Sequence, residues 1–76
     1  RLARAHDMDP RSTLQERLAQ RGETVRFEYR RSGPDHDVTF EATAIVGDRT
    51  VGTGSGGSKK AAAIDAARDA LERWSD

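Results

Sequence analysis

Residues 52–74, with the sequence GTGSGGSKKAAAIDAARDALERW, give the clearest indication of the fold of this chain. It opens with a glycine-rich run at residues 52–57, and Ser58 then supplies a side chain of the type that caps helix starts. Alanine follows at every fourth position until Trp74 takes the next place, and this spacing puts these residues on one helix face. We predict a flexible loop at residues 52–57 and a helix at residues 59–74, whose small side chains let it lie close to a sheet.

The chain before this helix contains segments that alternate between apolar and polar residues, which is the pattern of half-buried strands. Residues 24–31 and residues 38–46 alternate in this way, and residues 49–53 are predicted to form a short third strand. A loop at residues 33–36 and a tight turn at residues 47–48 separate the strands. The side chains predicted to point away from the polar face are those of Val25, Phe27, Tyr29, Val38, Phe40, Ala42, Ala44 and Val46.

A first helix is predicted to begin at Asp9 and Pro10, because Asp caps helix starts and Pro suits the first helical position. Gly22 is suited to end this helix. Its narrow apolar stripe consists of Leu14, Leu18 and Ala19. The order of elements is then α-β-β-β-α, and the predicted fold class is α+β, with two helices packed on one face of a three-stranded antiparallel sheet.

Length and composition fit one small domain. The chain has 76 residues, of which 34% are hydrophobic and 34% are charged, as in soluble globular proteins. No apolar run approaches the roughly 20 residues that span a bilayer, and no cysteine is present for disulfides or thiolate metal sites. Residues 1–8 lack periodicity and are predicted to be a linker or frayed leader, while residues 9–76 form the domain. The chain begins with Arg1 rather than Met, as a piece of a longer protein would.

Three motifs in this sequence resemble those of double-stranded-RNA-binding domains. The first is the run of residues 52–71, in which alternating glycines lead to a Ser-Lys-Lys sequence and then to the alanine face. The loop at residues 33–36, with Phe40 after it, resembles the family's second motif. The sequence Ser12-x-Leu14-Gln15-Glu16 resembles the first helix, most closely that of the C-terminal domain of bacterial ribonuclease III. Three motifs together are specific, whereas one alone would be weak.

The resemblance implies that the chain binds double-stranded RNA, largely independently of sequence, as the substrate-binding module of a larger RNA-processing protein such as ribonuclease III. It also implies a cytoplasmic location, with no catalysis by this chain, no cofactor and no contact with membranes. Three regions would contact the RNA, two in successive minor grooves and one at the phosphates between them. These regions are Ser12, Gln15 and Glu16 in one minor groove, Gly33, Pro34 and His36 in the next, and Ser58, Lys59 and Lys60 at the phosphates.

The chemistry of the second helix start supports this assignment independently. A-form RNA hides its major groove and displays 2′-hydroxyls in a wide minor groove, so its reader needs hydrogen-bonding groups for sugars and cations for phosphates. A helix start has unpaired N–H groups and a positive dipole end, and Lys59 and Lys60 add full charges. A tight turn within residues 52–57 would let further backbone N–H groups face phosphate. Arg26 and Arg30 alternate onto the other face of their strand, which we expect to face solvent.

Two observations favour a function of another class, the docking of a protein partner. The formal net charge is zero, whereas proteins that bind phosphate usually carry a basic surplus. Ala63 occupies the position where the family often has a third cation. The matches at Glu16, His36 and the two lysines favour RNA instead. A protein partner, or a homodimer formed through another domain of the parent protein, stays open as an alternative.

Other ligand sites fit the sequence less well. Gly52, Gly54 and Gly57 have the spacing of a dinucleotide-binding fingerprint, but that site needs a parallel strand after the helix, and none follows in this sequence. Ser rather than Lys follows Gly57, so the phosphate-binding P-loop is excluded. The Asp-His-Asp sequence at residues 35–37 lacks ligands from elsewhere, which adjacent residues need to hold a metal ion. Clustered carboxylates for metal-dependent RNA cleavage are absent as well, so no catalytic or metal site is predicted.

Overall fold

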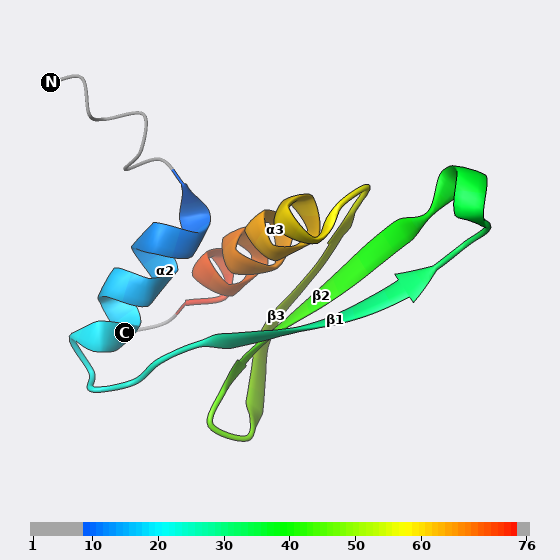
Figure 1. Cartoon of the computed structure of the whole chain (residues 1–76). Helices are drawn as coiled ribbons and strands as arrows, with labels where there is room; N and C mark the ends of the chain where they lie inside the picture. The colour runs from blue at the N-terminus through cyan, green and yellow to red at the C-terminus, as the bar shows by residue number, and fades with distance from the viewer. Residues whose placement is uncertain (1–8, 75–76) are drawn as a thin grey trace, which may run out of the picture.

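The computed structural model describes residues 9–74, and it places two helices on one face of a three-stranded antiparallel sheet (Figure 1). The predicted fold class and order of elements are confirmed. The leader predicted at residues 1–8 lies outside the described residues. The elements are α2 (Pro10–Ala19), β1 (Arg26–Ser32), the 3-10 helix η1 (Asp35–Asp37), β2 (Thr39–Val46), β3 (Arg49–Gly56) and α3 (Lys59–Glu72).

Helix α2 begins and ends where the sequence indicates. The Asp9 carboxylate accepts a hydrogen bond from the backbone N–H of Arg11 at 2.9 Å, so Asp9 is the N-cap. At the other end Gly22 has a φ of 73°, in the left-handed region that favours glycine. The N–H of Glu23 then reaches back to the carbonyl of Leu18 at 2.9 Å. This closure is a Schellman motif, and it ends the helix.

The core lies between the helices and the sheet and consists mostly of small side chains. Leu14 and Leu18 of α2 are 1% and 3% exposed, and they pack against Val46 at the end of β2 and against the later part of α3. Ala19, predicted to extend this stripe, is exposed instead. Successive helical residues point about 100° apart, and the contact of α2 with α3 is too narrow to include it. The buried alanines of α3 are Ala62, Ala63, Ala66, Ala67 and Ala70.

The first two strands lie within two residues of their predicted bounds. Their register pairs Phe27 with Ala44 and Tyr29 with Ala42, so the side chains predicted to share a face do so. A bulge between Ala44 and Ile45, where β2 pairs with β3, interrupts the alternation. As a result, the last three residues of β2 are all buried.

The third strand is longer than predicted, because β3 continues through most of the glycine-rich run. The prediction of a flexible loop with a tight turn at residues 52–57 is therefore wrong. A Cβ on Gly52 would lie 2.5 Å from the carbonyl oxygen of Ala66, and one on Gly54 would lie 2.3 Å from the backbone nitrogen of Ala66. Atoms do not approach so closely, so the missing side chains are what lets α3 pack directly on β3.

Strand β3 forms one edge of the sheet, and α3 covers part of that edge with carboxylates. The N–H of Thr53 donates to Oδ2 of Asp69 at 2.9 Å, and the N–H of Ser55 donates to Oδ2 of Asp65 at 3.1 Å. An open edge would offer these donors to another strand. Both are taken up within the domain, so the expectation that N–H groups of this run face phosphate is wrong for these two residues.

Candidate nucleic-acid interface

The start of α2 presents the first set of predicted contact residues. Ser12, Gln15 and Glu16 are exposed, and they surround a shallow hollow together with Arg11 and Phe27. They point outward because the two leucines of α2 occupy the opposite, buried face. Hydroxyl, amide and carboxylate groups beside one guanidinium can both donate and accept hydrogen bonds, as contacts to sugars and base edges require.

Asp9 holds the side chain of Arg11 in place at the start of α2. The guanidinium donates to both carboxylate oxygens, from Nε at 3.2 Å and from Nη2 at 2.8 Å. The pKa of Asp9 is lowered from 3.8 to about 2. The side-chain hydrogen bonds from Arg11 have the largest effect, and the hydrogen bond from its backbone N–H has the next largest. Desolvation of the carboxylate acts in the opposite direction and raises the pKa. The charges of Arg11 and Lys60 lower the pKa further. Helices α2 and α3 contact each other, and both begin at the same end of the molecule (Figure 1).

The second predicted contact region is the tip of the β1–β2 hairpin, which extends beyond both helices (Figure 1). Gly33 has a φ of 89°, and a Cβ there would lie 2.7 Å from the carbonyl oxygen of Asp37, so the tip requires glycine. Pro34 precedes η1, and its carbonyl accepts a hydrogen bond from the N–H of Asp37 at 2.9 Å. His36 lies in the middle of η1 and is exposed. The predicted loop is thus an ordered turn that presents an imidazole to solvent.

Ser58, Lys59 and Lys60 lie at the start of α3, as predicted. The Ser58 hydroxyl is the N-cap and accepts a hydrogen bond from the N–H of Ala61 at 3.0 Å, which leaves its own O–H to donate. Both lysines are exposed, and the Nζ of Lys59 lies 5.7 Å from the ring centre of Tyr29. Two ammonium groups at the positive end of a helix make this a favourable place for an anion.

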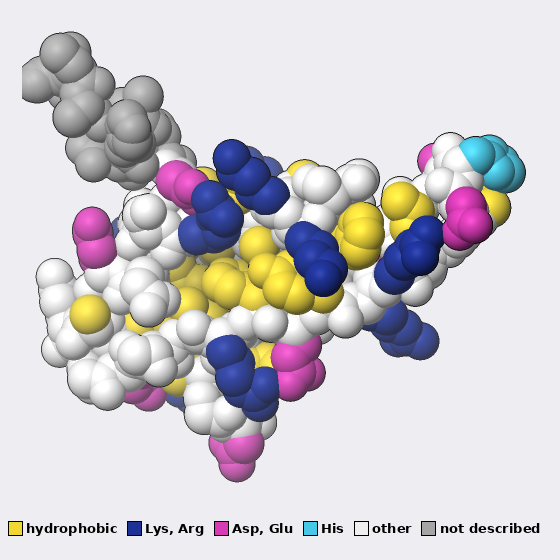
Figure 2. Space-filling model, viewed as in Figure 1, with side chains coloured by type: hydrophobic (Ala, Val, Ile, Leu, Met, Phe, Trp, Pro, Cys, Tyr) yellow, Lys and Arg dark blue, Asp and Glu magenta, His cyan; other side chains and the backbone are white. Residues whose placement is uncertain are grey.

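The starts of the two helices and the hairpin tip are exposed on the same side of the molecule (Figure 2). In this view Lys and Arg side chains border a strip of hydrophobic side chains that runs toward the hairpin, and the histidine lies at the hairpin tip. The structure therefore brings the first and third predicted regions together, while His36 stands apart from both at the end of an arm.

Sequence reasoning missed Arg11, Tyr29 and Arg31 as residues of this surface. Tyr29 is on the helix-bearing side of β1, but it is 43% exposed because α3 begins at Lys59, too late to cover it. Arg31 shares a hollow with Tyr29 and Lys59. The alternation of residues in β1 could have identified two of them, because it puts Arg31 on the same face of the strand as Tyr29 and Arg30 on the opposite face.

Ala63 is not a solvent-facing position of this surface, so a cation could not simply be added there. Its side chain is 2% exposed, whereas Lys59 and Lys60 are exposed. The residue belongs to the packed face of α3. Its difference from the family pattern therefore bears on packing as well as on charge.

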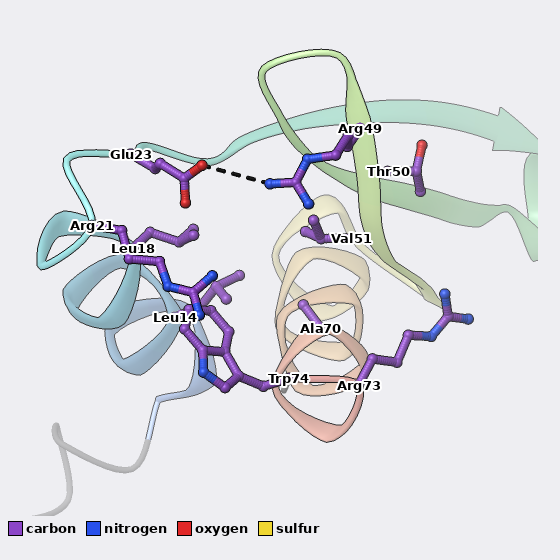
Figure 3. A pocket seen from close by; sticks show the side chains of 10 residues that line it. All are labelled: Leu14, Leu18, Arg21, Glu23, Arg49, Thr50, Val51, Ala70, Arg73 and Trp74. Carbon is purple, nitrogen blue, oxygen red and sulfur yellow. Dashed lines mark ion pairs between the residues drawn. The ribbon is translucent and has the colours of Figure 1, made fainter. Parts of the chain in front are cut away.

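A separate groove lies between the later parts of α2 and α3, and none of the predicted site residues lines it (Figure 3). Its volume is about 270 Å³. Trp74 packs against the core there, as the sequence predicts, and the guanidinium of Arg21 lies 4.5 Å from its ring centre. An ion pair between Arg49 and Glu23 at 3.5 Å closes one side.

The described part of the chain contains neither a metal cluster nor a membrane span. Within residues 9–74, no three or more His, Asp or Glu side chains are grouped so that they could hold a metal ion. No helix in that same part is long and apolar enough to cross a bilayer.

A sheet covered by two helices, with a cationic helix start beside a polar face and a protruding hairpin, defines a small α+β module with a nucleic-acid-binding surface. The chain belongs to the family described as the double-stranded RNA binding motif, which matches residues 10–73. The resemblance inferred from the three sequence motifs is confirmed.

The relatives of this chain include ribonucleases. It is 46% identical over 68 residues to Ribonuclease 3 of Latilactobacillus sakei subsp. sakei strain 23K, a match that covers 86% of this chain and 29% of the relative. It is 44% identical over 70 residues to Ribonuclease 3 of Corynebacterium efficiens, which covers 91% of this chain and 28% of the relative. The structure of Dicer from Pichia stipitis matches with a TM-score of 0.71 and 22% identity over 84% of this chain and 32% of that one, which shows the shared fold. The chain thus spans less than a third of the length of each of these relatives.

Proposed function

We propose that this chain binds double-stranded RNA through phosphates and minor-groove groups, largely without regard to sequence. The observation that supports this most is the juxtaposition of two exposed surfaces, the polar face at the start of α2 and the cationic start of α3 (Figures 1 and 2). The first suits 2′-hydroxyls and base edges, and the second suits phosphates. Every RNA duplex offers these groups, so recognition needs no particular base sequence.

The proposal assigns one role to each of the three contact regions. The α2 face enters one minor groove, and the hairpin tip with His36 enters the next one along the duplex. Lys59 and Lys60 meet the phosphates between these grooves. Two minor-groove contacts held at a fixed separation select A-form RNA over B-form DNA, because the two duplexes differ in groove width and depth.

We further propose that the chain is the duplex-binding part of a larger RNA-processing protein, located in the cytoplasm. The relatives named Ribonuclease 3 support the assignment to a larger RNA-processing protein, since the chain matches under a third of their length. Metal-dependent RNA cleavage needs clustered carboxylates, which we assign to another part of the parent protein. The chain itself would bind the substrate without catalysis.

The double variant Lys59→Ala/Lys60→Ala tests this function. We expect it to bind an RNA duplex of about 16 base pairs or more much more weakly than the unmodified chain does. Its plot of log affinity against log salt should be less steep by roughly two units. Arg26→Ala/Arg30→Ala is the matched control, because it removes two exposed cations from the face of β1 that the helices do not cover. Equal losses in both double variants would contradict the assignment of phosphate contacts to α3.

Docking of a protein partner, or formation of a homodimer, is the second candidate function. The zero net charge and the groove of Figure 3, with Trp74 on its wall, favour it. Under this alternative the unmodified chain would fail to shift an RNA duplex in a gel. A gel-shift titration of the unmodified chain therefore separates the two candidate functions before any variant is made.

A further inference from the structure

Tyr29 is an exposed aromatic side chain at the border of the surface that α3 covers. It is 43% exposed, and it is the one large hydrophobic side chain of residues 9–74 that is exposed to this degree. Its partner across the sheet is Ala42, which is 1% exposed beneath α3, so Tyr29 lies on the helix-bearing face just past the point where α3 begins.

The surroundings of Tyr29 are cationic. The Nζ of Lys59 lies 5.7 Å from its ring centre, within the range of a cation–π contact. Arg31 borders the same hollow, which Val38 and Phe40 complete with apolar surface.

The phenol hydroxyl of Tyr29 has no hydrogen-bond partner among the residues that the structure describes. A phenol is neutral at pH 7 and donates one hydrogen bond. A donor beside the ammonium of Lys59 suits a singly charged oxyanion. The apolar floor of the same hollow suits a group with exposed C–H bonds next to that anion. A ribose with its phosphate has both properties, whereas a free anion has only the first.

We propose that Tyr29 is a further RNA-binding residue, which donates a hydrogen bond from its hydroxyl to a backbone phosphate and packs its ring against the neighbouring ribose. Lys59 supplies the charge at this position, while Arg31, which borders the hollow, is paired with Asp35 at 3.0 Å. The inference rests on the proposed function, and it adds a contact on β1 to those at the two helix starts and the hairpin tip.

The place of Tyr29 in the sheet supports this role. Phe27, two residues earlier on the same face of β1, borders the hollow of the α2 contact residues. Arg31, two residues later, leads into the hairpin that ends at His36. Tyr29 therefore lies between the two surfaces assigned to successive minor grooves, where one strand of the duplex must cross the protein.

The test compares Tyr29→Phe and Tyr29→Ala with the parent in titrations of an RNA duplex of about 16 base pairs or more. Tyr29→Phe keeps the ring and its contact with Lys59 but removes the donor, and we expect affinity to fall about three- to tenfold, as for a hydrogen bond to a charged acceptor in a partly exposed site. Tyr29→Ala should lose more. The salt slope should be unchanged in both, because neither variant removes a charge.

Arg30→Ala is the matched control, since Arg30 is the next residue of β1 and lies on the opposite face. We expect it to bind as the parent does. A Tyr29→Phe variant that binds within about twofold of the parent, while Lys59→Ala/Lys60→Ala loses binding, would overturn the inference and leave the proposed function intact. A parent chain that binds no duplex RNA would overturn both.

A double-mutant cycle with Lys59→Ala separates a direct contact from the positioning of Lys59. If the hydroxyl contacts RNA itself, Tyr29→Phe lowers affinity by a similar factor whether or not Lys59 is present. If the effects of Tyr29→Phe and Tyr29→Ala both disappear in the Lys59→Ala background, Tyr29 acts only through the lysine, and the proposed contact is wrong.

Discussion

At the scale of single residues, Ala63 limits how many cations the start of α3 can present. Its side chain is 2% exposed, although Lys59 and Lys60 in the preceding turn are exposed. A lysine at this position must either bury its stem in a packed contact or displace its neighbours. We predict that Ala63→Lys lowers the melting temperature by roughly 5–20 °C, from about 1–3 kcal/mol of overpacking, without tightening RNA binding.

Ala61→Lys is the control for this prediction, because Ala61 is exposed in the same helical turn. Calorimetry on both variants, with titrations of duplex RNA at two salt concentrations, measures stability and charge separately. The outcome that contradicts the prediction is an Ala63→Lys variant of normal stability whose salt slope is steeper by about one unit. Its lysine would then reach a phosphate along the surface of α3.

Asp9 is a second residue whose effect can be isolated, because its pKa is lowered to about 2 by hydrogen bonds from Arg11. A carboxylate with a lowered pKa in the folded state stabilises the fold above its ordinary pKa of 3.8, and this stabilisation is lost as the pH falls toward 2. We predict that Asp9→Ala lowers the free energy of unfolding by about 1 kcal/mol at pH 6, as the loss of an N-cap does. The difference from the parent should shrink between pH 4 and pH 2.

Urea unfolding of parent and variant across this pH range checks the prediction. Glu72→Ala serves as the control, since Glu72 is an exposed carboxylate of α3 without an ion pair among the described residues. A stability difference for Asp9→Ala that stays constant from pH 6 to pH 2 would show that the carboxylate charge does not contribute.

At the scale of elements, the contact between α3 and β3 depends on the absence of side chains from the strand. A Cβ on Gly54 would lie 2.3 Å from the backbone nitrogen of Ala66, and that backbone cannot move without lifting the whole helix. We predict that Gly54→Ala costs about 1–3 kcal/mol or more, which lowers the melting temperature by roughly 5–20 °C. Circular dichroism during heating measures this directly.

Gly57→Ala is the matched control for Gly54→Ala. Gly57 lies just past the end of β3, has no atoms within 4 Å of the position that a Cβ would take, and does not have a positive φ. Alanine there should be tolerated within about 0.5 kcal/mol, as at other exposed positions. Similar losses from the two substitutions would mean that the glycines matter for chain flexibility, as the loop prediction assumed, and not for helix packing.

At the scale of the whole molecule, the features that the sequence predicts correctly are those encoded within a few residues. The N-cap at Asp9, the stop at Gly22 and the cap at Ser58 each depend on a local side chain or backbone angle. Alternation and the spacing of alanines likewise place β1, β2 and α3 within two residues of their observed bounds. These elements are sufficient to determine the order and the fold class.

The features that the sequence predicts wrongly depend on contacts between distant segments. Gly52 and Gly54 are typical of loops when taken alone, but they pair with Ala44 and Ala42 of β2, and the close approach of α3 leaves no room for side chains there. Tyr29 alternates with the core face, yet α3 begins too late to cover it. Ala63 follows two exposed lysines, and only the packing of α3 buries it. For the candidate site, the sequence predicted the elements on which the proposed contact residues lie. It did not predict that Arg11, Tyr29 and Arg31 lie on the surface between them.

Recognition of the A-form RNA duplex itself can be measured on the unmodified chain. The experiment is a titration with RNA and DNA duplexes of matched length and sequence at one salt concentration. We predict much tighter binding to RNA than to DNA, together with similar affinities for RNA duplexes of unrelated sequence, because the proposed contacts go to phosphates and 2′-hydroxyls. Equal affinity for the RNA and DNA duplexes would contradict the account.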